Sequence, residues 1–77
     1  MQASSLHPGD VVEISRVEGP AAVVDRLKEL GLAAGVQVVV LYRTLLGSTL
    51  AIEVLGQVIA LGREEAACIH FSGEKTA

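Results

Sequence analysis

The sequence predicts a mainly β domain, a small and nearly closed antiparallel barrel of five or six short strands with one α-helix inserted at about residues 20–30. Three observations lead to this prediction. The chain has 77 residues, which is room for one hydrophobic core. Hydrophobic residues make up 51% of it but aromatic residues only 3%, which is typical of a β-branched core. Short apolar runs alternate with glycine-containing turns, and a closed barrel hides the edges of such strands.

The first strand is predicted at residues 11–17. It follows the turn signal His-Pro-Gly-Asp at residues 7–10. Val12 and Ile14 then alternate with polar neighbours, which is the period of a strand with one buried face.

The inserted helix is predicted to begin at Pro20 and to end before Gly31. Proline suits the first helical position, and glycine suits the left-handed residue that stops a helix. Val23, Leu27 and Leu30 recur at helical spacing, and we interpret them as ordinary core. A helix of about eleven residues is too short to be stable alone, so this stripe must pack on the barrel.

The remaining strands are short and are separated by tight turns. Turns are expected at Ala34-Gly35, within residues 44–49, and at Gly56-Gln57. The segment GREEAACI is expected to form a single helical turn, with its acidic pair at the start. The predicted strands cover residues 36–43, 50–54, 58–61 and 69–71.

One domain is expected over residues 1–77, ordered from about residue 6 to residue 71, with tails at 1–5 and 72–77. No apolar run reaches the roughly 18–20 residues of a membrane-spanning helix, and the start lacks the pattern of a secretory signal. Cys68 is the one cysteine, which fits a reducing compartment. These features predict a cytoplasmic protein. A net charge of -3 with scattered basic residues argues against a nucleic-acid partner.

Two segments resemble the FeoA family of ferrous-iron transport accessory proteins, which have an SH3-like barrel. They read RLKELGLAAGVQVVV and LLGSTLAIEVLGQVIALGREEAACI. The match departs from the family pattern where Gly62 precedes Arg63 and where Ser48-Thr49 replaces an acidic residue and proline. The resemblance implies a non-catalytic accessory protein that binds the cytoplasmic part of the FeoB membrane transporter, which has a GTPase domain, and places it at the inner membrane through that partner. The family's glycines map onto turns, at Gly9, Gly31, Gly35, Gly47 and Gly56.

No constellation for catalysis or for a cofactor is found. His7 and His70 lie at opposite ends of the chain, and Cys68 has no CxxC companion. Cys68 and His70 are the one pair that could share a face of a strand as metal ligands. Glu64 and Glu65 diverge on a helical turn, so they are interpreted as helix starters rather than as a catalytic pair. The phosphate-binding glycine motifs are absent, so we expect neither an enzyme nor a cofactor nor a metal.

The predicted interaction surface is apolar with a charged rim. Three leucines surround Gly47 in a hairpin where polar residues are usual, and two apolar residues lie on the outward face of the strand before it. The three leucines either fold back as a cap or form an exposed apolar patch, and the two strand residues are covered either by the helix or by a partner. The rim residues on the helix are either simply solvated or part of the interface. The surface comprises Leu45, Leu46, Leu50, Val39 and Leu41, with Arg26, Glu29 and Arg43 as its rim.

Two other functions fit the same pattern. One is a self-associating module, in which outward apolar residues pair between copies to form a homo-oligomer. The other is a regulatory domain related to the SH3-like domains of metal-dependent transcription repressors, although these 77 residues contain no DNA-binding segment.

Overall fold

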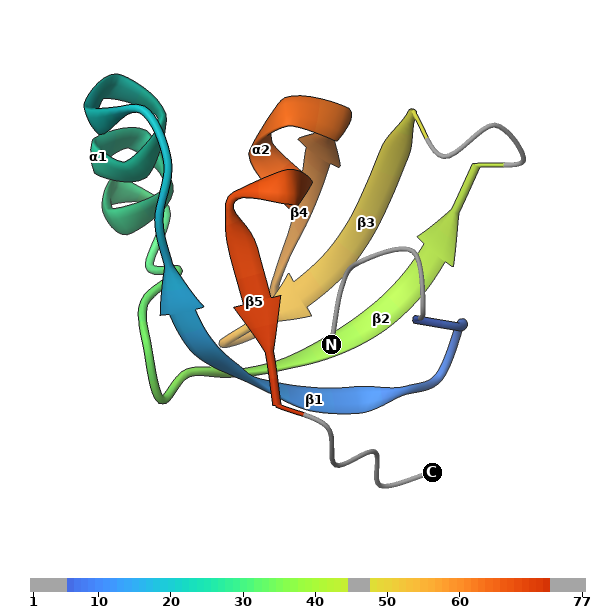
Figure 1. The fold of residues 1–77 in the computed structure, drawn as a ribbon. Coiled ribbons are helices and arrows are strands. Elements are labelled where there is room, and N and C mark those ends of the chain that lie inside the picture. Colours follow the sequence, from blue (N-terminus) through green and yellow to red (C-terminus); the bar gives the residue numbers. More distant parts are fainter. Residues whose placement is uncertain (1–5, 45–47, 73–77) are drawn as a thin grey trace.

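The computed structural model describes residues 6–44 and 48–72, and Figure 1 shows how its elements are arranged. The predicted strand, helix and four further strands appear in that order, and the single helical turn appears as a short second helix. In chain order the elements are β1 (Val11–Val17), α1 (Ala21–Glu29), β2 (Gln37–Arg43), β3 (Thr49–Val54), β4 (Gln57–Gly62), α2 (Arg63–Ala67) and β5 (Ile69–Phe71).

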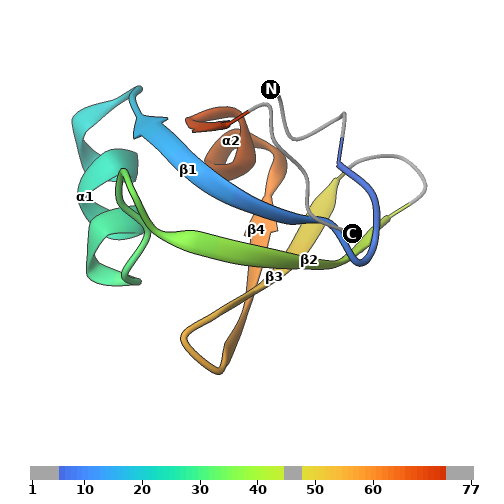
Figure 2. The ribbon, with the colours of Figure 1, turned by 90° about the horizontal axis from the view of Figure 1, so that it is seen from below.

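The strands form one antiparallel sheet in the order β4-β3-β2-β1-β5. The sheet bends around its concave face, as Figures 1 and 2 show from two directions. α2 follows β4 directly and contacts β3, β4 and β5, and Figures 1 and 2 show that it lies at the end of β4 opposite the β3–β4 turn. The fold class is therefore confirmed as mainly β, with five strands.

The core lies on the concave face and consists of aliphatic side chains. Val12 and Ile14 of β1 and Val38 and Val40 of β2 are fully or almost fully buried, as their alternation predicts. Leu50 is also in this core, 3% exposed and opposite Leu61. Its prediction as part of an exposed leucine cluster is therefore wrong, because β3 begins at Thr49 and points the next side chain inward.

The turn between β3 and β4 is one residue earlier than expected. Val54 pairs with Gln57, so the two turn residues are Leu55 and Gly56, with φ angles of 50° and 82°. Two consecutive positive φ angles define the tight hairpin turn that matches strand twist. Gln57 therefore opens β4 instead of turning the chain.

α1 attaches to the barrel through few side chains. Leu27 is its one fully buried residue, and Val23 packs against the core from a half-buried position. Leu30 caps the helix and is 38% exposed, so its assignment to the core is wrong. Gly31 follows with φ 89°, which ends the helix as predicted.

The C-terminal boundary is slightly further along than expected. The backbone N–H of Ser72 donates a hydrogen bond of 2.7 Å to the carbonyl of Glu13. Ser72 therefore extends the pairing of β5 with β1. The predicted tail at 1–5 lies outside the described residues, as does the rest of the predicted tail at 72–77.

Candidate interaction surfaces

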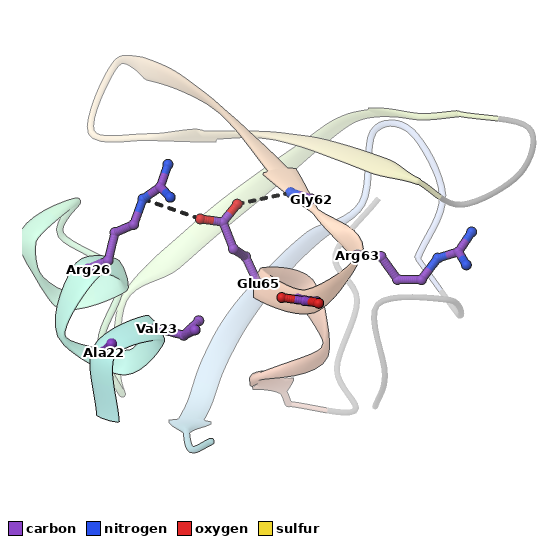
Figure 3. Close-up of a pocket in the computed structure, with 7 residues that line it drawn as sticks. Ala22, Val23, Arg26, Gly62, Arg63 and Glu65 are labelled. Atoms are coloured by element: carbon purple, nitrogen blue, oxygen red, sulfur yellow. Dashed lines mark hydrogen bonds and ion pairs between the residues drawn. The ribbon is translucent and has the colours of Figure 1, made fainter. Parts of the chain in front are cut away.

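A pocket of about 530 Å³ opens between α1 and α2. Figure 3 shows Val23 and Arg26 facing it from α1, and Glu65 facing it from α2, while the Arg63 side chain points away from α1. Its complete lining is Ala22, Val23, Arg26, Gly62, Arg63, Glu64 and Glu65.

Both carboxylate oxygens of Glu65 make contacts at this pocket. Its Oε1 accepts a hydrogen bond of 3.0 Å from the backbone N–H of Gly62, which is the reciprocal half of a capping box. Its Oε2 is buried, accepts no hydrogen bond from the described residues, and lies 3.4 Å from Nε of Arg26. The charged residues of the lining are two arginines and two glutamates, so the lining as a whole carries no net charge.

The outward side of β2 is partly covered. Val39 and Leu41, predicted as members of the apolar surface, are both half-buried, while Arg43 is exposed at the end of the strand. A bulge at this point shifts the register between Val40 and Tyr42. Leu45 and Leu46, the centre of the predicted surface, lie outside the described residues.

The three predicted rim residues do not surround one patch. Arg26 and Glu29 belong to α1, whereas Arg43 is the last residue of β2. Figures 1 and 2 both place α1 and that end of β2 at opposite ends of the molecule. Arg26 is instead the partner of Glu65 across the pocket.

The outer face of the sheet carries apolar residues that the sequence reasoning did not assign to a surface. One row crosses it from Val11 through Val39 and Glu53 to Val58. Among the residues described, the most exposed large hydrophobic side chains are Leu55, 90%, Val58, 65%, and Tyr42, 52%. The signal was present, since Val58 alternates with buried Ile59, but the strand VIAL was not assigned an outward side.

The described histidine, cysteine and acidic side chains do not gather into a candidate metal site. Among the residues described, no three His, Cys, Asp or Glu side chains gather as metal ligands do. His70 lies 3.3 Å from Glu18, which also pairs with Arg16 at 3.2 Å. Cys68 is buried and its thiol points to the carbonyl of Glu64 at 3.4 Å. Cys68 ends α2 and His70 lies within β5, so the structure does not place this pair on one strand.

Neither helix of the described chain has the length and apolar character needed to span a membrane. Both are short, and α1 has only one fully buried residue.

The family to which the chain belongs follows from its similarity to known proteins. The family model for the FeoA domain matches residues 1–72, a range that includes all the described strands and both described helices. This chain belongs to the FeoA family. The family is involved in ferrous iron transport, and the resemblance found in the sequence is thereby confirmed.

Solved structures of other FeoA proteins share the fold. The FeoA protein of Chlorobium tepidum is 34% identical, with a TM-score of 0.81, over 92% of this chain and 68% of that one. An iron uptake regulatory protein, also named FeoA, is 26% identical with a TM-score of 0.78, over 90% of this chain and 91% of that one. No curated protein gave a match.

The relation to repressors is one of fold alone. A manganese-dependent transcriptional repressor is 15% identical with a TM-score of 0.79, over 92% of this chain and 40% of that one. The barrel of this FeoA-family chain therefore also occurs as part of larger proteins.

Proposed function

We propose that this FeoA-family protein is a non-catalytic accessory protein of ferrous iron uptake, located in the cytoplasm, that binds the cytoplasmic part of a FeoB-type transporter. The observation that carries the proposal is the FeoA domain match over residues 1–72. A binding role also agrees with the described surface, where Leu55, Val58 and Tyr42 expose apolar side chains.

The docking surface that we propose is the end of β2 and the hairpin after it. Leu41 is half-buried there, and Tyr42 is 52% exposed. Tyrosine is enriched at protein interfaces because its ring buries a large area while its hydroxyl tolerates water. Arg43 follows as a charged neighbour, and Leu46 in the hairpin is the apolar residue that we expect at the centre.

Calorimetric titration against the isolated cytoplasmic region of the FeoB-type transporter tests this function. The titration is made with and without guanine nucleotide. We expect saturable binding by the wild type and its loss in Leu46→Asp. Absence of binding by the wild type under every nucleotide condition would overturn the proposal.

Leu55→Asp is the matched control. Leu55 is 90% exposed in the turn between β3 and β4, and the substitution changes the charge by the same amount. Its left-handed backbone also tolerates aspartate. We expect this variant to bind as the wild type does, so loss of binding in both variants would contradict the proposed location.

A further inference from the structure

β4 is an open edge of the sheet. It is the first strand in the order β4-β3-β2-β1-β5, so β3 lies on one side of it and no strand of the described chain lies on the other. A strand in this position presents backbone N–H and C=O groups that another strand can pair with.

The register identifies the backbone groups that face this edge. Val54 and Gln57 flank a two-residue turn, so they form a hydrogen-bonded pair, and such pairs alternate along an antiparallel ladder. Ile59 and Leu61 therefore bond to β3, while Val58, Ala60 and Gly62 point outward. The hydrogen bond from Gly62 N–H to Glu65, 3.0 Å, confirms this alternation. Within the described chain, Val58 and Ala60 have no such partner.

β4 lacks the features with which proteins protect an edge strand. Natural edges are shortened, bulged, marked with lysine or proline, or covered by a helix or loop. α2 contacts β4, but only at the end of the strand that it follows. β4 has six residues, QVIALG, with no charge and no proline, and its pairing with β3 has no bulge. The other edge strand, β5, has only three residues. The long edge of this sheet is thus the unprotected one.

The sequence of β4 is complementary to itself in antiparallel orientation. If Ile59 lies on a two-fold axis opposite its own copy, Val58 faces Ala60 of the copy and Gly56 faces Gly62. Val58 and Ala60 are exposed and apolar, and no charge approaches a like charge in this register. The outward backbone groups at Val58 and Ala60 then meet as hydrogen-bonded pairs, with about four bonds in total.

We propose that two copies of this chain associate through β4, antiparallel about a two-fold axis at Ile59, into one continuous ten-stranded sheet. Figures 1 and 2 both show α2 at the end of β4 opposite the β3–β4 turn, so α2 does not lie over the half of β4 next to the turn. The pairing covers the exposed side chain of Val58 and the outward backbone of Ala60. This dimer is independent of transporter binding, and failure of one proposal leaves the other standing.

The dimer is expected to be a concentration-dependent equilibrium. A few backbone hydrogen bonds and two small apolar pairs form an interface below the usual size of a permanent one. Sedimentation velocity across a concentration series should therefore show the wild-type chain passing from monomer to dimer. In the same samples, amide exchange at Val58 and Ala60 should slow as the concentration rises, while that at other exposed amides should not.

Two charge variants test the register. Val58→Lys with Ala60→Lys places like charges opposite each other across the axis, and Val58→Glu with Ala60→Lys places opposite charges there. Both positions are exposed in the monomer, so both variants should fold, as checked by circular dichroism. We expect the first to weaken the dimer at least about tenfold relative to the second.

Three results would overturn the proposal. The wild type could stay monomeric throughout the series, as it would if the edge serves a strand of a different protein. The two charge variants could dissociate equally, which would exclude the register about Ile59. Concentration-dependent protection could also appear at amides other than those of β4, which would place the contact elsewhere.

Discussion

Glu65 joins the start of α2 to α1 through its two carboxylate oxygens. Oε1 accepts the N–H of Gly62 at 3.0 Å, and Oε2 lies 3.4 Å from Nε of Arg26. The first contact satisfies a donor that the helix start leaves open, and the second holds α1 across the pocket. One side chain therefore connects the inserted helix to the last turn before β5.

Glu65→Ala should lower the free energy of unfolding more than Glu65→Gln does. Glu65→Ala loses both contacts, and we expect it to lower the free energy of unfolding by about 0.5–2 kcal/mol, the usual effect of a lost cap. Glu65→Gln keeps an acceptor for Gly62 and loses only the ion pair with Arg26, whose side chain is 70% exposed. That pair contributes about 0–1 kcal/mol. Urea denaturation measures both variants, and equal losses would contradict this division.

Gly19 should not tolerate a side chain. A Cβ at Gly19 would lie 2.6 Å from Sγ of Cys68, and the φ angle of Gly19 is 155°. Gly19→Ala should therefore destabilise the protein by about 1–3 kcal/mol through overpacking. With Cys68→Ala as background the clash is absent, so the same substitution should cost less. A double-mutant cycle from thermal unfolding measures the difference, and strict additivity would disprove the contact.

Leu27 should account for most of the attachment of α1. It is fully buried, whereas Leu30 on the same helix is 38% exposed. Leu27→Ala should cost about 2–5 kcal/mol because it leaves a cavity, and Leu30→Ala distinctly less. Guanidinium denaturation compares the two. If the two variants lost similar amounts of stability, Leu27 would not be the main attachment of α1 to the barrel.

Leu55→Asn should stabilise the chain. Leu55 has φ 50° and is 90% exposed, so leucine is strained there and contributes almost no burial. Asparagine followed by Gly56 is the preferred sequence of this hairpin turn. We expect a gain of about 0.5–1 kcal/mol, by analogy with other relieved backbone positions. A melting temperature that fell would show that Leu55 has contacts beyond its own turn.

The sequence was most informative where one rule decided a position. Period-two alternation identified Val12, Ile14, Val38 and Val40 as core, and a positive φ was correctly expected at Gly31. These predictions depend on neighbours along the chain. The fold class also followed, because short alternating runs leave few other architectures.

The surface could not be assembled in the same way. Grouping Arg26 with Arg43 required the direction of α1 relative to β2, and the pairing of Arg26 with Glu65 required α2 to lie beside α1. Neither the direction of α1 nor the position of α2 beside it can be predicted from neighbouring residues in the sequence. Leu50 was misassigned because it was grouped with the leucines of the hairpin, although it lies in the strand in which Ile52 and Val54 are also buried. The docking surface and its partner therefore stay predictions.

The pairing of β1 with β5 determines when this protein can complete its fold. Ile14 lies opposite Phe71, so residues from near the two ends of the described chain complete the core together. Of the described strands, β1 is the first to emerge during synthesis and β5 is the last, so β1 must wait for its partner. Such distant pairing slows folding, and until it forms the apolar side of β1 is open to other chains. Nascent chains that stop before Ile69 should therefore be the species that chaperones retain.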